Sequence, residues 1–276
     1  MLERISRSSF NLKKLKIILL SLLIIYLASG LVIYLFQEKL IFLDGSIPED
    51  YAFKFQYKFE ELNLTTGDDA ILNALHFKSE ESKGLIIYFH GNAGDLRRWG
   101  KVVEFYVELG YDVLIMDYRG FGKSTGKRTQ ANLLSDAELF YQYALNDYSE
   151  DRITIFGRSL GTGIASYLAS KHKPKQLILE TPYYDFKSVV QRYFPIFPVG
   201  LALRFNFRSH EYLQSAECPI YIFHGTKDEV VPYRLGQKLA ESISNNSVQL
   251  ITVDGGKHKN LIDFEVFREA MRGILD

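Results

Sequence analysis

Cysteine is almost absent from this chain of 276 residues. Because Cys218 is the only one, an intrachain disulfide and a metal cluster built on several cysteines are both excluded. The chain also lacks an excess of charge of either sign, since 33 Lys and Arg balance 33 Asp and Glu. A formal net charge of zero offers no broad basic surface, so we expect no nucleic-acid partner. Internal repeats and low-complexity tracts are missing as well.

What the chain does contain is typical of a globular protein with a substantial core. Apolar residues make up 47% of the sequence and charged residues 24%. The length suits one large domain, or one domain with an appendage. We expect a globular domain over residues 55–276, preceded by a linker over residues 37–54.

The appendage is a run of twenty residues without a charge, residues 17–36. At the rise of an α-helix this run is about 30 Å long, the thickness of the hydrocarbon core of a bilayer. It therefore predicts a transmembrane helix. A cleaved signal peptide, with Ala28 and Gly30 before the cut, and a buried core helix are the alternatives. Because the apolar run continues for six residues beyond Gly30, an uncleaved anchor is favoured.

Charge asymmetry around this run predicts its orientation. Residues 1–16 form a basic segment with five Lys or Arg and a single acidic residue, whereas Glu38 and Lys39 follow the run. Because positive residues stay on the cytoplasmic side, we expect a single-pass membrane protein with a cytoplasmic N-terminus and its globular domain on the opposite side.

Beyond the linker, strand-like and helix-like segments alternate. Residues 57–64 and 70–77 flank a turn cluster and predict an antiparallel hairpin. Six further apolar runs are separated by helical stretches, which predicts right-handed crossovers and an α/β fold with a mostly parallel eight-stranded sheet covered by helices on both faces. Residues 185–215 interrupt this alternation. They are rich in aromatic residues and predict a small helical cap at the carboxyl edge of the sheet. Single aromatic side chains could simply pack the cap onto the body, but as a group they favour the lining of an apolar pocket.

The most informative stretch is ITIFGRSLGTG at residues 153–163. A serine between two glycines, at the turn from a buried strand into a helix, is typical of a nucleophile elbow. Such a turn holds the serine in a strained conformation with its hydroxyl above the sheet, so Ser159 is the candidate nucleophile. The alternative is a glycine-rich turn with a serine cap.

A serine hydroxyl needs a base, and the base needs an acceptor that orients it. His258 is the candidate base, because it follows the last predicted strand in a loop with two glycines. Asp228 directly follows another strand and is the candidate acid. Asp228 could instead cap a helix, and Glu180 is the rival acid. The remaining histidines fit less well, and His90 and His224 are interpreted as braces of their loops.

An acyl-transfer site also needs donors for the oxyanion that develops in the transition state. The backbone N–H of Leu160 lies at the positive end of the predicted helix and is one candidate. The backbone N–H of Asn92, in the loop after the strand at residues 85–89, is the other.

Five motifs in order carry a resemblance to a known family: HGNAG at 90–94, DYRGFGKS at 117–124, GRSLGTG at 157–163, HGTKDEVVP at 224–232 and GGKHKN at 255–260. With them the chain resembles the serine hydrolases of the α/β-hydrolase fold, in particular the membrane-anchored Bem-type and serine aminopeptidase-like branch. The resemblance covers about residues 55–276. It implies a triad of Ser159, Asp228 and His258, in the chain order that this fold uses.

The resulting hypothesis is a membrane-anchored serine hydrolase that cleaves carboxylic esters or thioesters through an acyl-enzyme. The anchor and the aromatic cap favour a lipid-like or acylated small-molecule substrate. Such a triad requires no metal and no organic cofactor. The alternatives are a serine aminopeptidase-like peptidase and a non-catalytic, hydrolase-like binding domain.

Overall fold

The computed structural model describes residues 2–244 and 248–276, without the side chains of residues 2–11 and 201. Its body is built on a sheet of eight strands. The strands are β1 (Phe59–Thr65), β2 (Ile71–Phe77), β3 (Leu85–Phe89), β4 (Asp112–Met116), β5 (Ile153–Arg158), β6 (Gln176–Glu180), β7 (Ile220–Gly225) and β8 (Val248–Val253). Their order across the sheet is β1-β2-β4-β3-β5-β6-β7-β8.

The sheet is mostly parallel, as predicted. Only β1 with β2 and β2 with β4 pair in the antiparallel sense, which confirms the hairpin. From β4 to β8 every neighbouring pair is parallel. The carboxyl ends of these strands therefore meet at one edge of the sheet, where ligands of such sheets bind.

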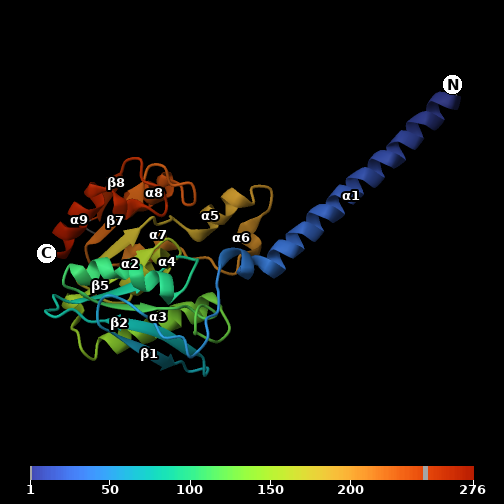
Figure 1. The fold of residues 1–276 in the computed structure, drawn as a ribbon. Helices are drawn as coiled ribbons and strands as arrows, with labels where there is room; N and C mark the ends of the chain where they lie inside the picture. Colours follow the sequence, from blue (N-terminus) through green and yellow to red (C-terminus); the bar gives the residue numbers. More distant parts are fainter. Residues whose placement is uncertain (1, 245–247) are drawn as a thin grey trace.

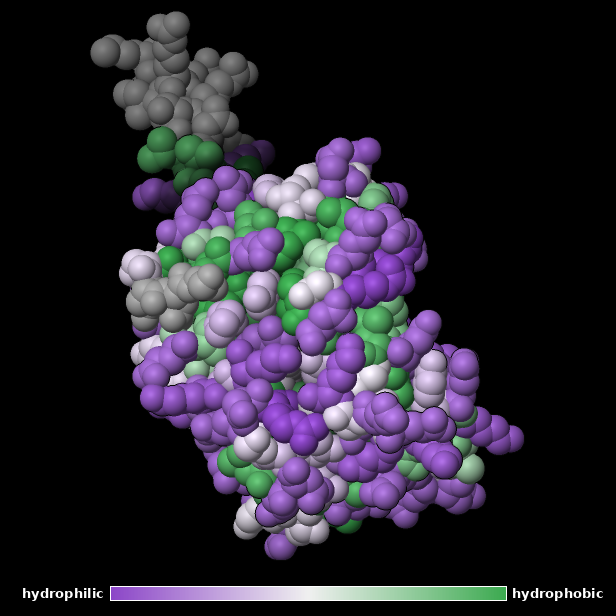
Figure 2. Space-filling model, turned by 90° about the vertical axis from the view of Figure 1, so that its left-hand side faces the viewer, coloured by the Kyte–Doolittle hydropathy of each residue, from purple (hydrophilic) through white to green (hydrophobic). Residues whose placement is uncertain are grey.

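Helices cover both faces of the sheet. One face packs against α2 (Leu96–Glu108) and α9 (Glu265–Leu275). The other packs against α3 (Gln130–Ala144), α4 (Gly161–Ala169) and α8 (Tyr233–Ser242). Figure 1 shows these layers, and Figure 2 shows that hydrophilic side chains cover most of the face opposite the N-terminal helix.

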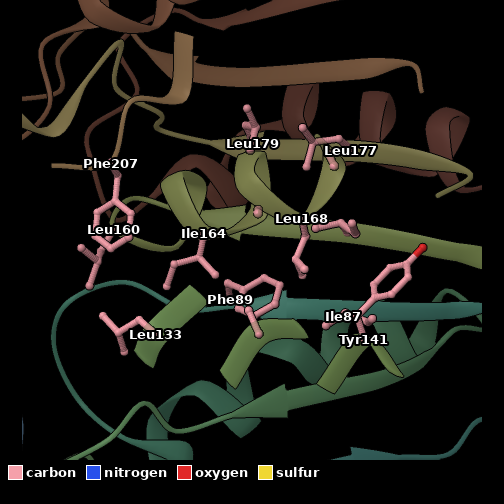
Figure 3. Packing of buried hydrophobic residues seen from close by; sticks show 14 of the residues in the cluster. Ile87, Phe89, Leu133, Tyr141, Leu160, Ile164, Leu168, Leu177, Leu179 and Phe207 are labelled. Atoms are coloured by element: carbon pink, nitrogen blue, oxygen red, sulfur yellow. The ribbon is translucent and has the colours of Figure 1, made fainter. Parts of the chain in front are cut away.

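The core under α4 fixes the position of the turn that precedes this helix. Ile164 and Leu168 of α4 point toward Phe89 and Ile87 of β3, and all four side chains are buried (Figure 3). Full burial of each such side chain contributes about 1.5–3 kcal/mol to stability. The start of α4 is therefore held firmly against the central strands.

The N-terminal helix α1 (Leu2–Ile41) extends away from the body (Figure 1). Its segment Leu12–Ile41 is long and apolar enough to cross a membrane, and none of its most apolar window is buried. This exposure excludes the alternative of a buried core helix. The predicted span of residues 17–36 lies inside this segment, and the helix continues to Ile41.

The chain that follows α1 is attached to the body. Phe42 is buried, and its ring lies 4.8 Å from that of Phe205. Leu43 forms an isolated β-bridge with Ala93, and Ser46 forms one with Gly122. Part of the segment predicted as a linker is thus hydrogen-bonded to loops at the carboxyl edge of the sheet.

The predicted cap at residues 185–215 consists of short helices. They are α5 (Phe186–Tyr193), α6 (Val199–Ala202), α7 (Ser209–Tyr212) and a 3-10 turn, Leu213–Ser215. The side chain of Asp185 caps α5 by accepting the N–H of Ser188. Figure 1 shows α5 and α6 between the body and the base of α1.

Candidate active site

The elbow predicted at Ser159 is present between β5 and α4. Ser159 has a φ of 51°, a left-handed conformation that is strained for a residue with a side chain. A Cβ at Gly157 would lie 2.7 Å from the Cβ of Ala165, and one at Gly161 would lie 2.1 Å from the carbonyl oxygen of Phe89. Only glycine fits at these two positions, as the motif requires.

Three side chains from separate loops meet above the carboxyl edge of the sheet. The hydroxyl oxygen of Ser159 lies 2.9 Å from Nε2 of His258. On the other side of the same ring, Nδ1 lies 2.8 Å from Oδ2 of Asp228. Ser159 follows β5, Asp228 follows β7 and His258 follows β8, so the parallel strands bring together the residues that the sequence singled out.

Asp228 has further partners that hold it in place. Its Oδ1 accepts the backbone N–H groups of Val230 and Val231, both at 2.8 Å, so this oxygen also caps the turn before α8. Burial raises the pKa of Asp228, but hydrogen bonds with His224 and His258 outweigh burial and hold it well below its usual value. The carboxyl group is therefore ionised at neutral pH.

His224 and His90 brace loops, in agreement with their interpretation from the sequence. Nε2 of His224 donates to the carbonyl of Val231 at 2.9 Å and lies 3.4 Å from Oδ2 of Asp228. Nδ1 of His90 lies 2.7 Å from the carbonyl oxygen of Gly91, and its Nε2 lies 3.4 Å from the buried Asp117.

Glu180, the rival acid, is engaged elsewhere. Its Oε1 lies 3.2 Å from Nε of Arg158, and both side chains are buried. Burial raises the pKa of Glu180, whereas the guanidinium of Arg158 opposes that rise. Arg158 also donates to the backbone carbonyl of His258 at 3.4 Å. The ion pair thus supports the loop of His258, and within the described ranges no hydrogen bond joins Glu180 to the imidazole.

The two predicted oxyanion donors lie beside the serine. Asn92 and Leu160 line the same cavity as Ser159. Among residues 2–244 and 248–276, neither of their N–H groups donates to another backbone group. The amide Nδ2 of Asn92 donates to the carbonyl of Ile41, the last residue of α1, at 2.8 Å, and the carbonyl of Asn92 accepts the N–H of Leu43 at 2.8 Å.

The cavity at Ser159 has a volume of about 260 Å³ and is mostly apolar. As predicted, the cap supplies aromatic residues to it, among them Phe186, Tyr193 and Phe194. The sequence did not predict that Leu40 and Ile41 also line it. No local signal marks them, because their position depends on how the end of α1 packs against a cap that lies about 150 residues later.

Comparison with known proteins supports the same family. A family model described as "Serine aminopeptidase, S33" matches residues 80–207. A lysophosphatidylserine lipase ABHD12 from Danio rerio is 31% identical over 89% of this chain and 79% of its own length. Protein bem46 from Schizosaccharomyces pombe is 30% identical over 77% of this chain and 76% of its own length.

The fold also matches solved structures. An esterase from Pyrococcus furiosus superposes with a TM-score of 0.67 over 84% of this chain and 98% of that chain, at 22% identity. This likeness shows the fold alone, whereas the identity to the ABHD12 and bem46 proteins extends over most of the sequence. The chain belongs to the α/β-hydrolase family of serine hydrolases, in its Bem-type branch, and is a carboxylic ester hydrolase.

Proposed function

We propose that this chain is a membrane-anchored serine esterase whose nucleophile, base and acid are Ser159, His258 and Asp228. The observation that carries the proposal is the continuous chain of contacts from hydroxyl to imidazole to carboxylate, at 2.9 and 2.8 Å. The depressed pKa of Asp228 supports its role, because an ionised carboxylate stabilises the imidazolium that forms during the reaction.

In this mechanism Ser159 attacks the carbonyl carbon of the substrate while Nε2 of His258 accepts its proton. The N–H groups of Asn92 and Leu160 stabilise the tetrahedral oxyanion, a contribution of about 3 kcal/mol for one such donor. His258 then returns the proton to the departing alcohol or thiol, which leaves an acyl group on Ser159. Water, activated by His258, attacks this acyl-enzyme and releases the acid.

The surroundings of Ser159 favour an acyl substrate with a polar leaving group. The acyl part would occupy the apolar cavity beneath the cap. A second hollow of about 30 Å³, about the volume of one water molecule, adjoins Ser159 and His258. It is lined by Arg98, Trp99 and Lys259 among others, and the cationic groups of Arg98 and Lys259 would lie beside the first polar atoms of the leaving group. Relatives named as lysophosphatidylserine lipases agree with a lipid-like ester, and thioesters share the same chemistry.

A peptidase is the second candidate, because the matching family model is named for an aminopeptidase. That activity would require a site for the charged terminus of a peptide. The described residues that line the larger cavity at Ser159 carry no charge, which favours the esterase.

An activity-based probe tests the proposal. We expect a fluorophosphonate to label the full-length protein in detergent, and labelling to disappear in Ser159→Ala. Ser170→Ala is the matched control, because Ser170 lies at the far end of α4 from the elbow. Within the described part of the chain, its hydroxyl donates only to the backbone carbonyl of Tyr167. Labelling that persists in Ser159→Ala, or that is absent from the folded wild type, would contradict the proposal.

The chain length of hydrolysed p-nitrophenyl esters then tests the acyl cavity. We expect kcat/KM to rise from acetyl to octanoyl esters, because a longer chain buries more apolar surface against the cap. A preference for acetyl would contradict a lipid-like substrate.

A further inference from the structure

Another cavity, which we call the outer cavity, lies between α1 and the cap. The cavity at Ser159 is called the inner cavity. The outer cavity has a volume of about 200 Å³ and is lined by α1 within residues 26–41 and by the cap within residues 190–203. None of the described residues that line it carries a charge. Four of them also line the cavity at Ser159: Leu40, Ile41, Val190 and Phe194. The two cavities are therefore neighbours that share one apolar wall.

Specific contacts hold the anchor helix against the cap. Gln37 is 5% exposed; its Nε2 donates to the carbonyl of Ala202 at 3.1 Å, and its Oε1 accepts the N–H of Arg204 at 2.8 Å. Farther along the helix, the hydroxyl of Tyr26 donates to the carbonyl of Ile196 at 3.0 Å, and its ring stacks on Phe197 at 5.0 Å. The outer cavity is thus bounded at both ends by hydrogen bonds between α1 and the cap.

With residues 17–36 across a bilayer, as the sequence predicts, these contacts place the tip of the cap at membrane depth. Tyr26 lies ten residues inside the apolar run that ends at Phe36, about 15 Å along the helix axis. That distance is about half the thickness of a hydrocarbon core. The tip reads FPIFP at residues 194–198, and Ile196 is 71% exposed. An apolar tip that contacts the middle of the span is suited to lie among acyl chains rather than in water.

We propose that the outer cavity is the route and the distal binding site for one fatty acyl chain, which passes from the surrounding leaflet to Ser159. The anchor helix forms one wall of this site, so it contributes to substrate binding as well as to attachment. This inference rests on the proposed esterase function and narrows its substrate to a long-chain acyl ester that resides in the bilayer.

The chemistry of the lining identifies the occupant. A polar ligand would lose its hydration in this cavity without charged partners to replace it, whereas an acyl chain exchanges one apolar environment for another. A chain that enters beside the cap tip reaches the inner cavity past Val190 and Phe194, and its carboxyl end then lies next to Ser159.

Two substitutions in the full-length protein test the route. Ala202→Trp places a bulky ring in the outer cavity at an exposed position away from Ser159, and Ile196→Asp places a charge on the cap tip. Arg192→Trp is the matched control, because Arg192 is an exposed residue of α5 that lines neither cavity. Each protein is reconstituted in phosphatidylcholine nanodiscs and assayed with p-nitrophenyl butyrate and with an embedded 1-palmitoyl lysophospholipid.

We expect butyrate hydrolysis and fluorophosphonate labelling within twofold of wild type for Ile196→Asp and Arg192→Trp. For Ala202→Trp, whose side chain lies in the proposed site itself, the readout is the ratio of palmitoyl to butyrate hydrolysis. Palmitoyl hydrolysis in Ile196→Asp and this ratio in Ala202→Trp should fall at least tenfold, and both should remain unchanged in Arg192→Trp. Palmitoyl hydrolysis that is unaffected, while the variants remain active on butyrate, would overturn the route. A wild type inactive on butyrate and unlabelled by the probe would instead refute the proposed function.

A crosslinking measurement on the wild type covers the case in which a variant fails to fold. A palmitoyl lysophospholipid with a photoreactive diazirine near the end of its chain is irradiated in the nanodiscs, and adducts are mapped by mass spectrometry. We expect adducts on residues 26–41 of α1 and 190–203 of the cap. Adducts confined to other segments, on protein that reacts with the probe, would overturn the inference.

Discussion

At the scale of single residues, Asp228 divides its two carboxylate oxygens between two tasks. One oxygen caps the turn at Val230 and Val231, and the other faces His258. The sequence offered the helix cap and the catalytic acid as alternatives, and the structure contains both contacts. The geometry explains this, because an Asp at the start of a turn can satisfy backbone donors with one oxygen and leave the other free for a side chain.

Asp228→Asn isolates the contribution of the negative charge. The amide can keep the shape of the site but cannot stabilise the imidazolium, and it favours the wrong tautomer of His258. We expect kcat for p-nitrophenyl butyrate to fall by about 10⁴-fold with little change in thermal unfolding. A loss of less than tenfold would indicate that another carboxyl group, with Glu180 the nearest candidate, serves the histidine.

His76 in β2 predicts a pH dependence of stability. Burial, assisted by the charge of Lys78, lowers the pKa of His76 from 6.5 to about 4. The folded state binds the proton less readily than the unfolded state, so the contribution of His76 to the free energy of unfolding is largest above pH 6.5, where the ring is neutral in both states. That free energy falls as the pH drops from 6.5 toward 4, by up to about 3 kcal/mol.

We expect His76→Phe to remove that part of the acid sensitivity, since the ring keeps a similar volume between Tyr143 and Tyr148 without a titratable group. Urea titrations in detergent at pH 7 and pH 4.5 measure the free energy of unfolding. Equal pH dependence in the variant and the wild type would contradict the assignment.

At the scale of elements, the turn from β5 to α4 is the most constrained part of the site. The strained serine and the two glycines work only because α4 packs tightly on β3 and β5. The sequence predicted this turn because every requirement is local. Boundaries that depend on neighbours are less predictable: after β8 the chain first forms a 3-10 turn, Leu261–Asp263, and α9 starts only after the extended residue Phe264.

Gly157→Ala tests how closely these elements are packed. The added methyl group would meet Ala165 and the backbone of the elbow, so we expect a loss of about 1–3 kcal/mol in stability and reduced probe labelling of Ser159. Gly273→Ala in α9 is the matched control, because nothing lies within 4 Å of its Cβ position. There, alanine should raise stability by about 0.5–1 kcal/mol. Similar unfolding temperatures for the two variants would argue against a tight elbow.

At the scale of the whole molecule, the mostly parallel sheet and the edge that carries the site were predictable, because alternating apolar runs and helices imply parallel strands with their carboxyl ends together. The docking of α1 was not predictable in this way. It depends on contacts such as Gln37 with Ala202 and Tyr26 with Ile196, which join residues more than 160 positions apart. Periodicity and composition report only on neighbours along the chain.

The orientation in the membrane is a prediction for the whole molecule. The basic residues before the span favour a cytoplasmic N-terminus and a hydrolase domain on the opposite side. In sealed vesicles that expose their cytoplasmic face, we expect added protease to spare the hydrolase domain until detergent is present. Digestion without detergent would reverse the assignment.

The hydrogen bonds from Asn92 to Ile41 and from Leu43 to Asn92 join α1 to the loop beside Ser159. Helix α1 and the hydrolase body are therefore not interchangeable modules. A chimera that replaces residues 1–36 with an unrelated transmembrane helix would remain tethered, yet it would lose much of one side of the acyl site. A comparison restricted to the hydrolase domains of such proteins would overlook a segment that packs directly against the cap.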